Sequence, residues 1–280
     1  MIKTQKRQYI LAEKYNLFMN NLVIISNWLD KGTKQLDQLL MQITKSDPGV
    51  KYDLLVVSNL SNISIFKIEE IKFVLMNHIS NIISKSLFPP DTFDVLIREN
   101  IGMNIGAWQD GWLKMPNFEN YLFLQDEVIL LKDNWFICYI NKLNFILNNN
   151  SNIFLIGESI NNRWNCSWED LRMSALNTKA IGHPNNINRV DFYLAKFNEW
   201  SINPGAVACH LRSLIWFTNN KTMNEIKGFK IGKSYGECIA AEIAASLSVI
   251  SKNGIVRQLD NDPFKNFYHP DWRKDGISKL

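Results

Sequence analysis

Two clusters of polar side chains, each directly after a short hydrophobic run, hold the residues of this chain whose types and spacing suit chemistry. The run 93–97 is followed by Arg-Glu-Asn at 98–100, and the run 121–124 by Gln-Asp-Glu at 125–127. Both runs have the length and the β-branched or aromatic content of strands. In a parallel α/β sheet, ligands bind beyond the carboxyl ends of the strands. The clusters therefore predict a ligand site at one edge of such a sheet.

The second cluster has the composition of a metal site. Asp126 and Glu127 are adjacent carboxylates that directly follow a hydrophobic strand. Hard divalent cations such as Mg²⁺ or Mn²⁺ take carboxylate oxygens and commonly bridge to substrate phosphates. Alternatively, the two acids cap the next helix, where they would interact with its dipole by roughly 0.3–1 kcal/mol. With the segment 98–106 nearby, the sequence favours the metal site.

The two clusters resemble motifs of GT-A glycosyltransferases that use nucleotide sugars, in particular family 2 and rhamnan-synthesis-like enzymes. In those families an R-x-N-x-G segment follows one strand, and a variant of Asp-x-Asp ends a later strand. Here these are 98–108 (RENIGMNIGAW) and 123–130 (FLQDEVIL). Gln125 replaces the family's first acid and Glu127 its last, so which of Asp126 and Glu127 holds the metal stays open. The resemblance implies a GT-A fold, a Rossmann-like α/β fold whose mostly parallel sheet is flanked by helices and joined by an acceptor-side region.

The resemblance also implies where a nucleoside diphosphate sugar donor would bind. In the family, the ends of the first two strands hold the base and ribose. Those positions carry Ser and Asn here, which also favour turns and helix caps. The implied donor-binding residues are Ser26, Asn27, Ser58, Asn59, Arg98, Asn100, Gly102, Asn104, Gln125 and Asp126. A Mn²⁺ or Mg²⁺ ion would be held by Asp126, Glu127 and His269, the last from the C-terminal segment that closes the site in many GT-A enzymes.

The segment 235–242 (YGECIAAE) resembles the Gly-Glu-Asp helix of inverting family members. An acid there deprotonates the acceptor hydroxyl, which makes Glu237 the expected base. Cys238 stands where the family has a second acid, and an ordinary first-turn glutamate is the competing interpretation. His210 is a further candidate for acceptor contacts. The implied reaction is inverting transfer of a sugar to a hydroxyl of a saccharide or lipid-linked glycan, in surface polysaccharide synthesis.

Two other functions remain open. A nucleotidyltransferase would share the sheet, the phosphates and the metal. Its loop after the first strand is usually rich in glycine and basic residues, whereas 26–32 (SNWLDKG) has one glycine and one lysine. A non-catalytic member of the fold, which binds a sugar, a nucleotide or a partner protein, is favoured by Gln125 and Cys238, because both replace acids of the family's motifs.

The hydrophobic pattern predicts the elements that position these residues. Alternation of strands and helices up to about residue 130 predicts right-handed βαβ units and a mostly parallel sheet. Strands are predicted at 21–26, 53–58, 93–97, 121–124, 153–156 and 204–209, and helices at 33–44, 68–86 and 132–147.

The expected organisation is one domain with two functional halves. An amphipathic lead-in helix spans 1–20, a nucleotide-sugar-binding half spans 21–156, and an acceptor-binding half with the closing segment spans 157–280. The region 157–203 is expected to be irregular. Its tryptophans are candidate platforms for an acceptor sugar: Trp164, Trp168 and Trp200.

Composition agrees with a globular α/β protein. Of 280 residues, 46% are hydrophobic, which suffices for a buried core. The net charge of +4 is too small and too dispersed to predict nucleic-acid binding. The four cysteines have no framework spacing and predict free thiols in a reducing compartment. Without a signal-like start or a long apolar run, we expect a cytoplasmic protein. The basic amphipathic segment 1–20 either packs as a surface helix or lies on the inner face of a membrane.

Overall fold

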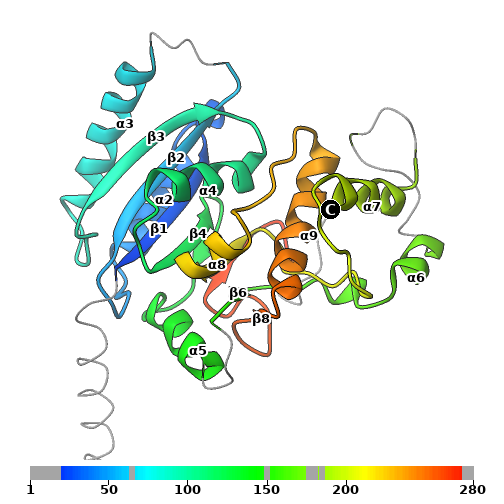
Figure 1. Cartoon of the computed structure of the whole chain (residues 1–280). Coiled ribbons are helices and arrows are strands. Elements are labelled where there is room, and N and C mark those ends of the chain that lie inside the picture. The colour runs from blue at the N-terminus through cyan, green and yellow to red at the C-terminus, as the bar shows by residue number, and fades with distance from the viewer. Residues whose placement is uncertain (1–19, 63–66, 148–151, 175–181, 183–186, 273–280) are drawn as a thin grey trace, which may run out of the picture.

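The computed structural model describes residues 20–62, 67–147, 152–174, 182 and 187–272. Seven strands form one sheet in the order β3-β2-β1-β4-β7-β6-β8 (Figure 1). Every strand runs in the same direction except β7, which is antiparallel to its neighbours β4 and β6. The prediction of an α/β fold with a mostly parallel sheet is confirmed. The strands are β1 (Asn21–Trp28), β2 (Asp53–Leu60), β3 (Phe93–Glu99), β4 (Asn120–Gln125), β6 (Phe154–Gly157), β7 (Ile215–Asn219) and β8 (Ile255–Gln258).

Helices cover both faces of this sheet. On one face lie α2 (Lys34–Ile43), α3 (Ile68–Ile83) and α5 (Ile137–Leu147). On the other face lie α4 (Met103–Lys114), α8 (Asn220–Glu225) and α9 (Tyr235–Ser251). The strands between them are buried on both sides, which explains why they read as continuous hydrophobic runs rather than as alternating ones.

A second layer of helices packs on the outer side of α9, in the right-hand part of Figure 1. It contains the 3₁₀ turn η3 (Asn162–Trp164), α6 (Trp168–Met173) and α7 (Arg189–Glu199). The prediction that 157–203 is irregular was therefore wrong. The three tryptophans supply apolar core there, because Trp164 and Trp168 are each only 8% exposed and Trp200 packs against two of the apolar clusters. Trp164 and Trp168 are therefore not open platforms for a sugar.

The chain around β4 brings the C-terminal segment to the sheet edge. After β4 a turn leads into β5 (Ile129–Leu130), which pairs antiparallel with β9 (Phe267–Tyr268). The helix predicted at 132–147 begins only at Ile137. Asp126 and Glu127 consequently lie in the β4–β5 turn and cap no helix.

Two further sequence predictions on elements need correction. The strand predicted at 204–209 is absent, and only an isolated bridge at Val207 occurs there. Gly205 has a φ of +63°, which a strand cannot accommodate. Conversely, the hydrophobic strand β7 was missed. Because β7 and β8 complete the same sheet, the two functional halves share one core, and the division at residue 156 stays a prediction.

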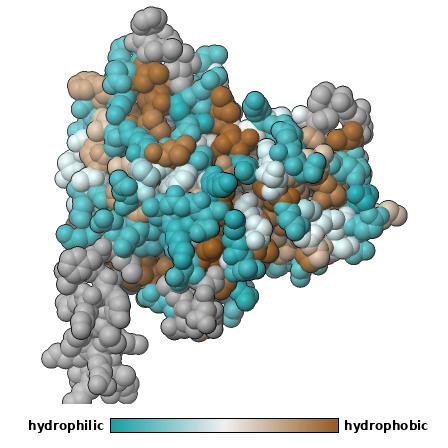
Figure 2. All heavy atoms as spheres, in the orientation of Figure 1, coloured by the Kyte–Doolittle hydropathy of each residue, from teal (hydrophilic) through white to brown (hydrophobic). Residues whose placement is uncertain are grey.

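The face of the molecule in Figure 2 is mostly hydrophilic, with hydrophobic atoms in scattered patches. Within the described residues, no helix is both long and apolar enough to cross a membrane. All four cysteines are free. The predicted helix at 1–20 lies outside the described residues except for its last residue.

Candidate functional site

The site lies where the order of the strands reverses. The chain proceeds from β1 outward to β2 and β3, then returns to place β4 on the other side of β1. In open α/β sheets, a crevice at such a switch point accepts ligands. The strand register aligns Asn59 with Arg98, Asn27 with Ser58, and Ser26 with Gln125. The residues predicted at the ends of four different strands are thus brought to one edge.

Asn27 is the centre of this edge. Its Nδ2 donates to Asp126 Oδ2 at 2.7 Å, and its Oδ1 accepts from Ser58 Oγ at 3.1 Å. The Asp126 backbone N–H donates to the Ser26 carbonyl oxygen at 3.0 Å. The Ser26 hydroxyl donates to the Leu124 carbonyl oxygen at 3.3 Å. Three strand ends are therefore tied into one rigid network that fixes the Asp126 carboxylate.

Electrostatics make Asp126 unusual. Burial raises its pKa to about 6, an effect that the hydrogen bond from Asn27 opposes and the negative charge of Glu127 reinforces. A cation close to the Asp126 carboxylate would favour its ionised form. Perturbed carboxylates in a crevice are a recognised sign of a functional site.

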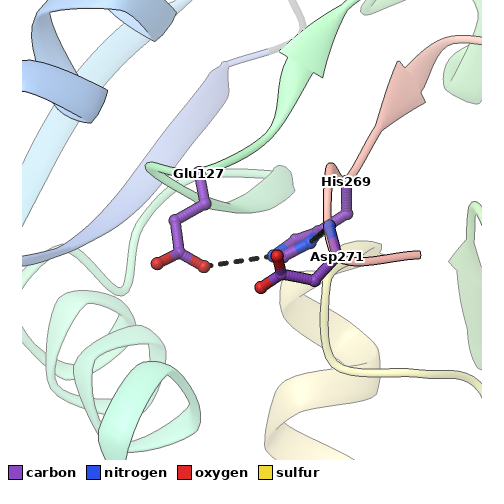
Figure 3. A group of neighbouring side chains, drawn as sticks. All are labelled: Glu127, His269 and Asp271. Atoms are coloured by element: carbon purple, nitrogen blue, oxygen red, sulfur yellow. Dashed lines mark hydrogen bonds and ion pairs between the residues drawn. The ribbon is translucent and has the colours of Figure 1, made fainter. Parts of the chain in front are cut away.

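Glu127 forms the second part of the site, together with the C-terminal turn (Figure 3). The ligand atoms of Glu127, His269 and Asp271 all lie within 4.8 Å of one another. The Asp271 backbone N–H donates to His269 Nδ1 at 3.2 Å. His269 Nε2 therefore carries the proton and donates to Glu127 Oε2 and to Gln125 Oε1, both at 3.2 Å. The hydrogen bond from His269 holds the pKa of Glu127 below its usual range.

This group fits a divalent cation. Two carboxylates and an imidazole nitrogen are ligands of first-row transition ions, and the imidazole favours Mn²⁺ over Mg²⁺. A cation at His269 Nε2 would displace the shared proton to Nδ1, so the contact from the Asp271 N–H would have to open. The sequence predicted Glu127 and His269. It missed Asp271, which belongs to no motif, whereas Asp126 is turned toward Asn27 and lies outside the group of three.

Arg98 organises the edge from the β3 side. Its guanidinium donates to Asp110 Oδ2 at 2.5 Å, to Asn59 Oδ1 at 2.6 Å and to the Ile101 carbonyl oxygen at 2.8 Å. All three guanidinium nitrogens are thus occupied. In this structure Arg98 therefore orients Asn59 and the start of α4.

The glycines of the 98–108 segment build the entry to α4. Gly102 precedes α4 with a φ of +78°. A Cβ on Gly106 would lie 2.0 Å from the Ile101 carbonyl oxygen, so only glycine fits. Asn104 Nδ2 donates to the Ser213 carbonyl oxygen at 2.5 Å. The buried Oδ1 of Asn100 has no hydrogen-bond partner.

A relay of hydrogen bonds connects Gln125 to α9. Gln125 Nε2 donates to the Ser213 carbonyl oxygen at 2.6 Å. The backbone N–H of Ser213, at 3.0 Å, and its hydroxyl both donate to Glu242 Oε2. The buried His210 places Nε2 at 3.3 Å from Glu242 Oε1. Burial acts to raise the pKa of Glu242, but the hydrogen bonds from His210 and Ser213 outweigh it and hold the pKa low.

Glu237, the predicted base, has a different environment. Ser234 caps α9, the Lys233 backbone N–H donates to Glu237 Oε2 at 2.6 Å, and Lys196 Nζ lies 2.7 Å from Oε1. This arrangement is close to a capping box. Burial acts to raise the pKa of Glu237, but these partners outweigh it and lower the pKa. Within the described residues no hydrogen bond links Glu237 to the β4 turn.

Two features near the site were not found from the sequence. Trp28, at the end of β1, is 41% exposed, and its indole N–H donates to Asp30 Oδ2 at 2.9 Å. Asp30 in turn accepts from the Ser61 backbone N–H at 2.8 Å, so the loops after β1 and β2 are tied together. A cavity of about 950 Å³ opens beside Asp126 and Glu127, between α2 and the β4–β5 segment. Ligand sites commonly have this volume, but apart from Asp126 and Glu127 the lining contains none of the residues predicted to bind the donor.

Comparison with known proteins finds similarity of fold alone. No family model matches the chain, and no curated protein matches it. One similar solved structure is WbbM, a bifunctional glycosyltransferase (12% identity, 86% of this chain and 39% of WbbM, TM-score 0.42). Another is S. aureus TarS 1–349 with UDP-GlcNAc (13%, 89% and 58%, TM-score 0.46). A third is core-mannan synthase A from Aspergillus fumigatus in a Mn/GDP form (10%, 95% and 80%, TM-score 0.42). The chain spans less than two thirds of the length of WbbM and of this TarS fragment, and similarity at this level assigns no residue and no substrate.

Proposed function

We propose that the protein is a metal-dependent GT-A glycosyltransferase that moves a sugar from a nucleoside diphosphate sugar to an acceptor hydroxyl. The observation that carries this proposal is the group Glu127, His269 and Asp271, placed at the switch point beside the perturbed carboxyl of Asp126. Adjacent strand ends supply polar groups for a nucleotide, and a cavity of suitable size adjoins the acids.

The donor's base and ribose are assigned to the ends of β1, β2 and β3. The exposed ring of Trp28 offers a face on which a base can stack, as aromatic rings commonly do. Asn59 and Asn100 supply amide groups for the base or ribose, and Asn100 Oδ1 is free to accept a hydrogen bond. Ser26, Asn27 and Ser58 act indirectly, because their side chains already bond one another or the backbone.

The diphosphate is assigned to the cation-binding group. A bound Mn²⁺ or Mg²⁺ ion would neutralise the diphosphate as it leaves, an effect worth several kcal/mol. Glu127, His269 and Asp271 would hold that ion, and Mn²⁺ suits the histidine better. The charge of Asp126 would contribute to the negative electrostatic potential around the ion. Gln125 and Asn104 both bond the Ser213 carbonyl oxygen and thereby hold the acceptor side in position.

In the transfer step, the acceptor hydroxyl oxygen forms a bond to the anomeric carbon while the bond from that carbon to the diphosphate oxygen breaks. The diphosphate leaves with the electron pair, and the hydroxyl proton passes to a carboxylate base. We propose Glu242 for this role, because Ser213 connects it to Gln125 at the site. Glu237 is the alternative that the sequence predicts. Inversion, the saccharide or lipid-linked nature of the acceptor, and a place in cytoplasmic polysaccharide synthesis beside a membrane remain proposals from the resemblance.

Binding experiments test this function before any acceptor is known. Thermal-shift measurements with UDP, GDP and dTDP, each with and without Mn²⁺, should show stabilisation by at least one diphosphate that depends on the metal. The matched control is Asp91→Asn, which removes an exposed carboxylate paired with Lys51 and leaves Asp126 and Glu127 intact. A panel of sugar nucleotides then identifies the donor through slow hydrolysis, which Glu127→Ala should abolish. No stabilisation by any nucleotide would refute the proposal and favour a non-catalytic binding module, while stabilisation by nucleoside triphosphates alone would indicate nucleotidyl transfer.

A further inference from the structure

Three arginines surround the 3₁₀ turn η3 on the acceptor side. Arg163 lies within η3 and is exposed. The Arg189 guanidinium lies 5.6 Å from the ring centre of Trp164, the last residue of η3. Arg212 Nη2 donates to Asn161 Oδ1, directly before η3, at 3.1 Å. Three positive charges therefore gather around one short turn.

None of these arginines has an ion pair within the described residues. Arg212 stacks on the ring of Trp272 at 3.9 Å, yet its Nε is buried without a hydrogen-bond partner. Arg189 Nε is likewise buried without a partner. Two other arginines have acidic partners: Arg98 bonds Asp110 among its three hydrogen bonds, and Arg172 is paired with Glu169 and Asp191.

The acids of this region bond groups other than the three arginines, although the charge of Glu242 acts on Arg212. Glu242 accepts from Ser213 and faces His210, and Glu237 is paired with Lys196. The undescribed segments 175–181 and 183–186 contain no acidic residue, whereas 273–280, which follows Trp272, contains Asp275. Within the described residues, one acid that acts on Arg212 stands against three arginines, and none of the three forms an ion pair.

The position of Arg189 in the fold also favours an anionic ligand. It is the first residue of α7, an eleven-residue helix whose N-cap is Asn188. A cation at a helix N-terminus opposes the helix dipole, whereas an anion there is favoured. An anionic ligand that contacts both the helix end and the guanidinium would offset this unfavourable placement of the positive charge.

We propose that Arg163, Arg189 and Arg212 form an oxyanion site that binds a phosphate or carboxylate group of the acceptor. A guanidinium group binds phosphate and carboxylate in the same way, through paired hydrogen bonds from its coplanar N–H groups to the charged oxygens. Arg212 follows His210 closely and precedes Ser213, both of which contact Glu242. An acidic group held here would place the acceptor next to the proposed base. The acceptor's role rests on the proposed transferase function, but oxyanion binding can be tested without it.

The test uses small probes and protein free of divalent metal. Calorimetry or ligand-observed NMR compares glycerol 3-phosphate and glucuronate with their neutral counterparts, glycerol and glucose. The double variant Arg163→Gln/Arg189→Gln removes two of the three charges and spares Arg212, whose stacking on Trp272 supports the C-terminal segment. Arg257→Gln, an exposed arginine on β8, is the matched control.

Wild-type protein and the Arg257→Gln variant should bind at least one anionic probe, more weakly as salt rises, and neither neutral probe. The double variant should bind that probe at least about tenfold more weakly, a difference of about 1.4 kcal/mol, and should keep its Mn²⁺-dependent response to nucleotide. The tighter of the two probes distinguishes a phosphate-bearing from a carboxylate-bearing acceptor. Equal binding of the anionic probe by double variant and wild type would overturn the proposal, as would equal binding of neutral probes. If no nucleotide binds but the probe still requires both arginines, the oxyanion site stands and the transferase role falls.

Discussion

Replacing Asp126 with asparagine should stabilise the protein at alkaline pH. Burial raises the pKa of Asp126 from 3.8 to about 6. Because this pKa is raised in the folded state, the protonated form contributes stability that is complete below about pH 4 and lost as pH rises through 6. A difference of about two pKa units corresponds to about 3 kcal/mol at pH 8. Asparagine avoids this loss and can still accept the hydrogen bond from Asn27.

Denaturant unfolding of wild type and Asp126→Asn between pH 4.5 and pH 8 measures this effect. The variant should gain up to about 3 kcal/mol at pH 8, equivalent to about 5 °C in Tm for a chain of this length, and the gain should shrink toward pH 4.5. Asp91→Asn, at an exposed ion pair with Lys51, should change stability by less than about 0.5 kcal/mol. A variant no more stable than wild type at pH 8, or equally stabilised at both pH values, would refute the electrostatic reasoning.

Further substitutions at four positions test other parts of the account. Glu242→Gln should preserve metal-dependent nucleotide binding and reduce transfer at least about 100-fold, and Glu237→Gln should mainly lower thermal stability; full transfer by Glu242→Gln would return the base assignment to Glu237. Gly106→Ala should cost about 2 kcal/mol or more in unfolding free energy, because its Cβ would collide with the Ile101 carbonyl oxygen; unchanged denaturation would contradict that packing. The buried Glu158 accepts from the Tyr139 hydroxyl and two backbone N–H groups of the segment that leads to His269. Glu158→Ala should therefore destabilise by about 3 kcal/mol and Glu158→Gln by less; equal denaturation midpoints for the two would show that these donors do not need the acceptor.

Strand positions were predictable because parallel strands buried on both faces leave continuous hydrophobic runs, and β1, β2, β3 and β4 were each found within three residues of their observed ends. The antiparallel β7 was missed because it enters the middle of the sheet from a distant part of the sequence. The helices of 157–203 escaped prediction because their apolar faces pack on α9 and on one another, so their tryptophans belong to a core that only the tertiary structure defines.

For the site, too, local sequence predicted some residues, whereas others depend on the tertiary structure. Side chains at strand ends could be predicted to meet, since parallel strands deliver their carboxyl ends to one edge, and the resemblance to GT-A glycosyltransferases predicted His269 beside them. Asp271 and Glu242 were not predicted, because neighbours from other segments give them their positions in the fold. Asp271 gains its place from the pairing of β5 with β9, and Glu242 from the hydrogen bonds of Ser213. Nothing in local sequence distinguishes such residues from ordinary surface acids.

Direct titration of Mn²⁺ in the presence of a nucleoside diphosphate, followed by electron paramagnetic resonance, is the sharpest test of the central claim. We expect wild-type protein to bind Mn²⁺ and nucleotide together, and Glu127→Gln to bind the ion at least about tenfold more weakly while its unfolding free energy changes little. Mn²⁺ binding of equal strength in wild type and Glu127→Gln would contradict the account.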